Sequence, residues 1–363
     1  MNWKISILTF ISIFSAGIAL GDVDISGYYR NQFSVVSTSG KLRTQDLHKS
    51  RLKFSASPSE KTNFELALNL FAKDFPKQED LQLESLLAPR LDVDRAYLKL
   101  YFSKFDLTLG KQRIAWGNGL LWNPTDVYNE IDPFDPKGER EGVSALHAYI
   151  PLSDTASIAT VLAFGDTVND ARTSLKASAV PFGVDFALSL TKDGTKQWIY
   201  GLDLKGELKV GYWLEGAYFR TTDDNFYKVE CGLDYTFGFG NGIYVALEFF
   251  HDSSGFEKLD KDAFTKLLTR ERDNLSRNYL YMIWQYQIND FASFRPASIL
   301  NADDRSFILL PTFSYLLFTD VEIIVGANIF GGKEGGEYNP NNKQDPAGIF
   351  GNSAFFVWLQ MNF

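Results

Sequence analysis

Residues 227–237 read YKVECGLDYTF. Their apolar side chains stand at every second position: Tyr227, Val229, Cys231, Leu233, Tyr235 and Phe237. A period of two is that of a β-strand, whose successive side chains point to opposite faces, whereas an amphipathic helix repeats every ~3.6 residues. Residues 227–237 therefore predict a strand with one apolar and one polar face.

The same alternation recurs along the whole chain, down to a last segment that ends on Phe363. Eighteen strands are predicted, with sixteen as the alternative count: residues 23–37, 47–57, 61–72, 92–102, 104–115, 142–151, 154–165, 171–179, 182–192, 196–206, 208–221, 226–239, 241–251, 277–288, 290–300, 304–317, 319–330 and 353–363. Very short turns alternate with longer connections in this series. That rhythm is typical of an all-β, antiparallel, up-and-down transmembrane β-barrel with both termini in the periplasm.

Composition agrees with a barrel and excludes other classes. Aromatic residues make up 15% of the chain, and the net charge of −9 argues against nucleic acid as a partner. After the N-terminal segment no stretch reaches the ~18 apolar residues that a transmembrane helix needs. A soluble β-helix or propeller is the alternative, but it would show a repeat of fixed length, and the sequence has none.

Residues 1–21 are predicted to be a signal peptide. Lys4 supplies the positive charge, residues 5–20 supply the apolar core, and residues 19–21 are suited to cleavage. An uncleaved anchor is the alternative. A lipoprotein is excluded because the only cysteine, Cys231, lies far from this segment and is predicted to pack or to face lipid. The mature chain, residues 22–363, is predicted to form one barrel domain in the outer membrane of a diderm bacterium.

Basic residues gather on the polar face of the first strands: Arg30, Lys49, Arg51, Lys53, Arg95 and Lys99. A register slip of one residue would turn each toward lipid, at about 2–4 kcal/mol apiece near the bilayer centre. They must therefore face the interior, and an interior with so many charges must hold water. A barrel of this size is wide enough to do so.

One long connection, residues 110–142, reads GKQRIAWGNGLLWNPTDVYNEIDPFDPKGEREG. Its prolines and aromatic residues favour a defined shape for the inserted segment, residues 116–141. Its acidic side chains are Asp126, Glu130, Asp132, Asp135, Glu139 and Glu141. Folding into the pore and capping of the outer rim are both open at this point. Whether the side chains of Lys111 and Arg113 continue the apolar face or point to the polar face depends on whether Gly110 forms a bulge that reverses the alternation.

The sequences GKQRIAWG (110–117), WNPTD (122–126) and NADDRS (301–306) resemble those of porin-like outer-membrane β-barrels, including alginate-export-like and related uncharacterised barrels. The resemblance implies that the loop after the fifth strand folds inward and narrows the pore. Its acidic residues would then face the basic wall, to which Arg113 would belong, and would produce a field across the channel.

The predicted function is passive diffusion of small hydrophilic solutes, with anions favoured by the basic wall. The alternatives are a substrate-specific or polysaccharide-export barrel and a structural or adhesive barrel. Catalysis is not expected, because His48, His147 and His251 fall in three distant strands, and no cofactor is predicted. A weak calcium candidate consists of Asp126, Asp132 and Asp135. The expected partners are outer-membrane lipid, the solutes, the barrel-assembly machinery through Phe363 and, by analogy with porins, two further copies in a homotrimer.

Overall fold

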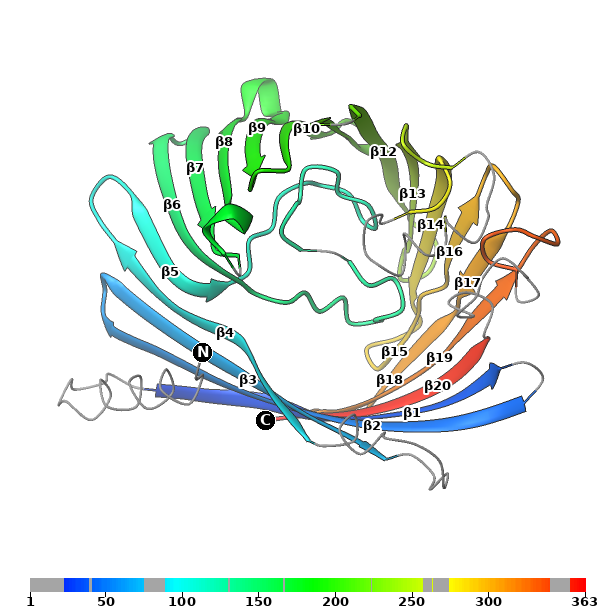
Figure 1. Ribbon diagram of the computed structural model, residues 1–363. Helices are drawn as coiled ribbons and strands as arrows, with labels where there is room; N and C mark the ends of the chain where they lie inside the picture. Colours follow the sequence, from blue (N-terminus) through cyan, green and yellow to red (C-terminus); the bar gives the residue numbers. More distant parts are fainter. Residues whose placement is uncertain are drawn as a thin grey trace.

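The computed structural model describes residues 23–38, 41–74, 89–129, 131–165, 167–222, 224–256, 263, 274–339 and 353–363, so the predicted signal peptide lies outside the described residues. The described chain forms a closed antiparallel β-barrel (Figure 1). Its strands are β1 (Val23–Thr38), β2 (Lys41–Ser59), β3 (Thr62–Asp74), β4 (Arg90–Tyr101), β5 (Asp106–Gln112), β6 (Val143–Ser153), β7 (Ala156–Ala163), β8 (Arg172–Ala179), β9 (Asp185–Asp193), β10 (Gln197–Glu207), β11 (Gly211–Thr221), β12 (Phe226–Phe237), β13 (Ile243–Asp252), β14 (Asn278–Gln287), β15 (Ala292–Phe294), β16 (Ala297–Asn301), β17 (Phe307–Leu310), β18 (Thr312–Phe318), β19 (Val321–Gly331) and β20 (Ala354–Asn362). Two 3-10 turns, η1 (Val168–Asp170) and η2 (Pro181–Gly183), lie between strands. Strand β20 pairs with β1 and closes the ring.

Two strands of the barrel are interrupted by proline. β15 and β16 both pair with β14 and are separated by Arg295 and Pro296. β17 and β18 both pair with β19 and are separated by Pro311. Proline has no N–H to donate to the ladder, so each strand breaks there although its carbonyl still accepts a hydrogen bond. The twenty segments therefore make an 18-stranded barrel, which confirms the larger of the two predicted counts.

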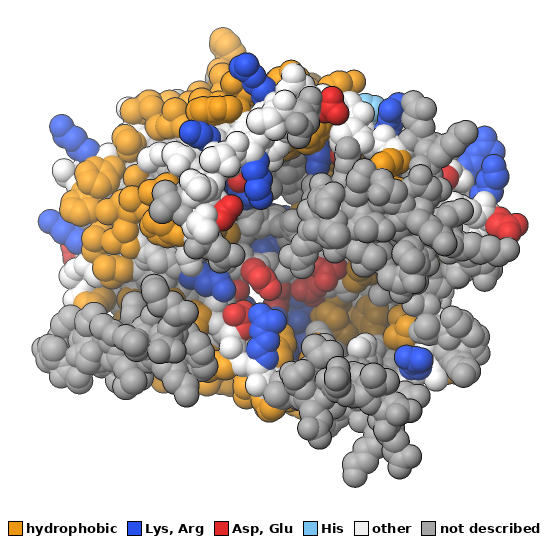
Figure 2. Space-filling view, in the orientation of Figure 1, with side chains coloured by type: hydrophobic (Ala, Val, Ile, Leu, Met, Phe, Trp, Pro, Cys, Tyr) orange, Lys and Arg blue, Asp and Glu red, His pale blue; other side chains and the backbone are white. Residues whose placement is uncertain are grey.

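The two faces of the wall differ as the alternation predicts. On β11 the side chains of Leu214 and Tyr218 are exposed on the outside, while Trp213 and Glu215 are buried on the inside. Figure 2 shows hydrophobic side chains over the outer wall and charged side chains deep in the central hollow. In the described part of the chain, no helix has the length and apolar character needed to cross a bilayer.

The connection after β5 runs inside the barrel (Figure 1). We call its described residues, 113–129 and 131–142, the inner loop. Its aromatic side chains pack on the inner wall: Trp122 stacks on Phe250 of β13 with ring centroids 5.0 Å apart, and Phe134 lies 5.9 Å from Phe330 of β19.

Three buried clusters form between the inner loop and the strands. Their wall residues are Ala145, Val161 and Ala163 on β6 and β7, Ile199, Ala217 and Phe219 on β10 and β11, and Phe250, Tyr279, Ile299, Ile308 and Leu310 on β13 to β17. The apolar core thus lies between the inner loop and the far half of the barrel. The charged inner side chains of β1 to β5 lie outside these apolar clusters and meet the inner loop through polar contacts.

Candidate pore constriction

The end of the inner loop is held to the first two strands by Glu139. Its carboxylate accepts hydrogen bonds from Arg30 Nη2 at 2.8 Å and from the Tyr28 hydroxyl at 2.6 Å, and it also bonds Lys49. Burial alone would raise the pKa of Glu139, but the charge of Arg30 and the bonds from Lys49 and Tyr28 outweigh burial and lower that pKa to about 2. Glu139 therefore stays ionised at any physiological pH.

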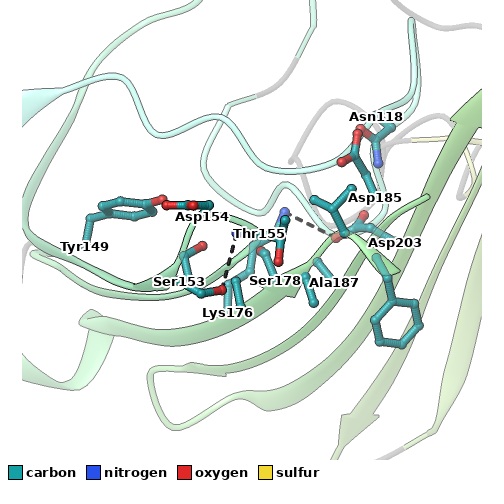
Figure 3. A pocket seen from close by; sticks show the side chains of 15 residues that line it. Asn118, Tyr149, Ser153, Asp154, Thr155, Lys176, Ser178, Asp185, Ala187 and Asp203 are labelled. Carbon is teal, nitrogen blue, oxygen red and sulfur yellow. Dashed lines mark hydrogen bonds and ion pairs between the residues drawn. The ribbon is translucent and has the colours of Figure 1, made fainter. Parts of the chain in front are cut away.

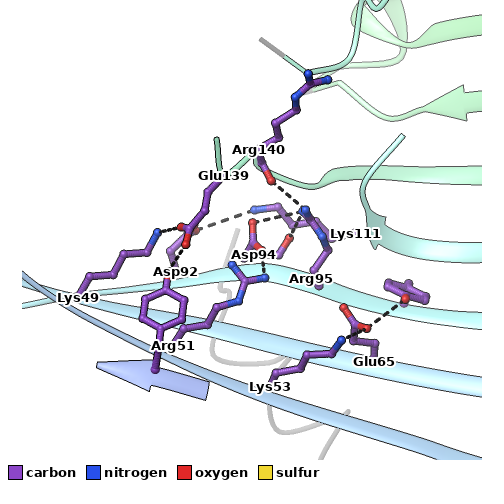
Figure 4. A network of polar contacts seen from close by, with 12 residues as sticks. Lys49, Arg51, Lys53, Glu65, Asp92, Asp94, Arg95, Lys111, Glu139 and Arg140 are labelled. Atoms are coloured by element: carbon purple, nitrogen blue, oxygen red, sulfur yellow. Dashed lines mark hydrogen bonds and ion pairs between the residues drawn. The ribbon is translucent and has the colours of Figure 1, made fainter. Parts of the chain in front are cut away.

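A second carboxylate, Asp94 of β4, lies between two arginines (Figure 4). Asp94 Oδ2 is 2.5 Å from Arg51 Nη2, and Asp94 Oδ1 is 3.3 Å from Arg95 Nη1. Arg95 also donates from Nη2 to the carbonyl oxygen of Arg140 in the inner loop at 2.8 Å. Glu139 and Asp94 thus each pair with two cationic side chains. Each group of one carboxylate and two cations therefore keeps a net positive charge beside the lumen.

Lys53 and Lys99 of the predicted basic wall, and Lys111 beside it, each have one acidic neighbour. Three ion pairs are formed, Lys53 with Glu65 at 2.9 Å, Lys99 with Asp106 at 3.4 Å and Lys111 with Asp92 at 4.0 Å. Among the described residues, Arg113 has no carboxylate within 4.0 Å, and it lines a cavity of about 220 Å³ together with Arg95, Lys99 and His147.

Gly110 precedes this region with a φ of +114°, a conformation that L side chains rarely adopt. The register of β5 with β4 and with β6 runs without a shift through Gly110, so the bulge that would reverse the alternation does not form there. A register shift lies instead between β3 and β4, at Ala67 and Leu68. The Lys111 side chain still comes within 4.0 Å of Asp92 of β4.

Most of the predicted acidic residues of the inner loop turn back on the loop itself. Asp126 is buried, accepts hydrogen bonds from the N–H groups of Tyr128 and Asn129, and lies 3.4 Å from Arg140; burial raises its pKa to about 6. Asp132 accepts from the N–H of Phe134, and burial raises its pKa.

Asp135 accepts from the N–H groups of Lys137 and Glu139, and Glu141 is exposed. Glu130 lies outside the described residues. Within the part of the chain that the structure describes, no three acidic, histidine or cysteine side chains are grouped to hold a metal ion. The candidate calcium set of Asp126, Asp132 and Asp135 is therefore not brought together.

The opposite wall carries a set of buried carboxylates that the sequence analysis did not single out: Asp203 on β10, Glu215 on β11, Glu230 on β12 and Glu248 on β13. Asp203 stands directly across from Glu215, and Glu215 across from Glu230, in the strand register. We call these four residues the acidic row. The four residues occupy inward-facing positions of their strands, as Arg51 does on β2. The alternation of the strands in the sequence was therefore the signal that could have identified them.

A cavity of about 290 Å³ lies on the inner wall of β6 to β10 beside the inner loop (Figure 3). Lys176, Asp185 and Asp203 line it, together with hydroxyl groups of the β6–β7 turn. Asn118 of the inner loop closes one side. The lumen is therefore polar on this side of the loop as well.

No protein-family model matches the sequence, and no curated protein sequence is detectably similar to it. Solved structures do match. OccAB1 of Acinetobacter baumannii superposes with a TM-score of 0.64 at 8% identity, covering 95% of this chain and 97% of that one. OpdK of Pseudomonas aeruginosa with vanillate gives 0.63 at 10% identity over 95% and 99% of the two chains. The outer membrane protein OprD of P. aeruginosa gives 0.60 at 8% identity over 95% and 94%.

The chain has an outer-membrane porin fold. At this level of identity the likeness lies in the barrel and not in particular side chains. The porin fold agrees with the first part of the resemblance drawn from the sequence, while the likeness to alginate-export barrels stays a prediction.

Proposed function

We propose that this protein is an outer-membrane porin that forms a water-filled channel for passive diffusion of small hydrophilic solutes and favours anions. The observation that carries the proposal is the arrangement around Glu139 and Asp94. Each of these carboxylates is shared by two cations, so the wall facing the open lumen keeps positive charge where the inner loop narrows it. Fixed charges at a narrow point select ions of the opposite sign.

The proposal includes the predicted route and setting of the protein. The signal peptide of residues 1–21 would direct export, the short turns and both termini would face the periplasm, and the strand ending at Phe363 would engage the barrel-assembly machinery. Assembly as a homotrimer is proposed by analogy with porins. A porin needs neither a catalytic group nor a cofactor, and the three histidines lie apart on β2, β6 and β13.

The test is single-channel recording of the refolded mature protein in a planar bilayer, with the anion-to-cation permeability ratio taken from the reversal potential in a salt gradient. The double variant Arg51→Ala, Arg95→Ala leaves Asp94 without its two cations, so the ratio should move toward cations. Arg220→Ala is the matched control, since Arg220 has the outward parity of β11 and is exposed. A folded barrel that never conducts would overturn the channel proposal, and an unchanged ratio in the double variant would overturn the anion preference.

A substrate-specific channel is the second candidate. OpdK, one of the structures with this fold, was solved with vanillate, which is an aromatic carboxylate. In the same bilayer, vanillate added to one side should interrupt the current of a specific channel at concentrations well below those of the salt. A general diffusion channel would show no such interruption.

A further inference from the structure

The inner loop meets the acidic row through its backbone. Glu248 accepts three consecutive N–H groups, those of Leu120, Leu121 and Trp122, at 2.5, 3.1 and 3.0 Å. Glu215 accepts the N–H of Asn118 at 2.8 Å and that of Thr125 at 2.7 Å. Five N–H groups of one eight-residue stretch, residues 118–125, thus converge on two carboxylates.

We propose that Glu215 and Glu248 act as positioning residues that clamp residues 118–125 to the wall and so set the width of the pore. The inference rests on the proposed channel function, because width matters only if the lumen conducts. It concerns residues that bind the loop and not the solute. We call this set of contacts the loop clamp.

The burial of these two carboxylates explains why they require hydrogen-bond donors from the loop. Glu215 and Glu248 are fully buried, and among the described residues neither has a lysine or arginine within 4.0 Å. A buried carboxylate without a cation must be compensated by hydrogen-bond donors. The peptide N–H groups of the inner loop are those donors, so the loop and the two carboxylates stabilise each other in this position.

The loop sequence is adapted to this close approach. A Cβ added to Gly117 would lie 2.6 Å from Glu215 Oε2, and Gly117 has a φ of +82°. A Cβ on Gly119 would lie 1.8 Å from the carbonyl oxygen of Trp122. Only glycine at these two positions lets the backbone turn tightly and reach the carboxylate.

Side-chain contacts fix the ends of the clamped stretch. The Thr125 hydroxyl lies between Glu215 and Asp203, at 2.9 and 2.8 Å from their oxygens. Trp122 stacks on Phe250, and its Nε1 donates to Asn274 at 3.2 Å. Neutralising one carboxylate should therefore loosen residues 118–125 without removing the loop from the barrel.

The experiment compares Glu248→Gln and Glu215→Gln with wild type in two measurements. Amide hydrogen exchange, read by mass spectrometry of the refolded protein, reports whether residues 118–125 are held. Glutamine keeps one acceptor oxygen but replaces the other with a donor, so exchange of these amides should accelerate by about tenfold or more. Single-channel recording should show a larger conductance with frequent sublevels. Asp234→Asn is the matched control, because Asp234 lies on the inner face of β12 but accepts its hydrogen bond from Tyr244 of the wall.

The outcomes separate this inference from the channel proposal. Wild type that conducts, with neither variant changing exchange or conductance beyond the Asp234→Asn control, overturns the loop clamp and leaves the channel standing. Faster exchange in the variants of a barrel that never conducts supports the contacts but overturns the channel. If one variant fails to show the heat-modifiable gel shift of a folded barrel, the other provides the test, since each carboxylate binds a different part of the stretch.

Discussion

Replacing Glu139 with glutamine should free the end of the inner loop from β1 and β2. A pKa lowered from the usual 4.5 to about 2 means that the surroundings favour the ionised form by about 3 kcal/mol. Glutamine can still accept a hydrogen bond from Tyr28, and lumen water can hydrate Arg30 and Lys49 once they lose their partner. We therefore expect Glu139→Gln to lower the free energy of unfolding by about 1–2 kcal/mol at pH 7.

The contribution of Glu139 can be recognised by how the free energy of unfolding depends on pH. Because the pKa of Glu139 is lower in the folded state, its contribution is complete above the ordinary value of 4.5 and is lost as the pH falls toward about 2. Wild type should thus lose this stability between about pH 5 and pH 2, and Glu139→Gln should lack that part of the loss. The assay is denaturant unfolding of the refolded barrel in lipid vesicles at a series of pH values.

Glu141→Gln is the control, because Glu141 is exposed in the same loop. If Glu139→Gln and Glu141→Gln have equal unfolding free energies at pH 7 and equal pH profiles, the argument that Glu139 ties the loop to the first strands is wrong.

Three further predictions use the same unfolding assay. Asp126→Asn should remove a pH dependence of up to about 3 kcal/mol, because a pKa raised to about 6 makes wild type lose stability as the pH rises from about 4 to 7. Gly110→Ala should destabilise the barrel by about 1–3 kcal/mol, because Gly110 has a φ of +114° and the new Cβ would lie 2.2 Å from the carbonyl oxygen of Ala96. The control Gly216→Ala should cost far less, because the nearest atom to its new Cβ would be the carbonyl oxygen of Lys228 at 3.9 Å. Leu247→Arg should cost about 2–4 kcal/mol in a bilayer, because Leu247 is exposed on the outer face of β13, whereas Leu247→Met should be nearly neutral; equal stability of the two would argue that this face does not contact lipid.

The strands could be predicted because their signal is local. Alternation of period two is present within each segment, and each strand pairs with its neighbours in the chain except where β1 meets β20 and closes the ring, so little long-range information is needed. The breaks at Pro296 and Pro311 were the exception: both were placed inside continuous predicted strands. The missing N–H of proline was visible in the sequence and explains both breaks.

The individual partners of the inner loop could not be predicted. The porin resemblance placed the acidic residues of the loop opposite the basic wall, but Arg30 and Glu139 are 109 residues apart, and nothing in either local sequence pairs these two residues. Parity alone places Glu215 and Glu248 on the inner face, but the donors that satisfy them depend on the path of the inner loop. Asp135 shows the reverse case, since an aspartate followed by proline commonly caps its own turn, and its side chain bonds the loop backbone and not the basic wall.

The contacts of the inner loop also couple its position to completion of the barrel. Glu139 binds β1 and β2, whereas the partners of residues 118–125 lie 90 residues further along the chain at Glu215 and 128 residues further at Glu248. Proteins that depend on pairing between residues so far apart in the sequence fold slowly. A barrel in which β11 and β13 had not yet joined the sheet would therefore hold the inner loop at one end only, and the passage would reach its final width only when both strands are in place.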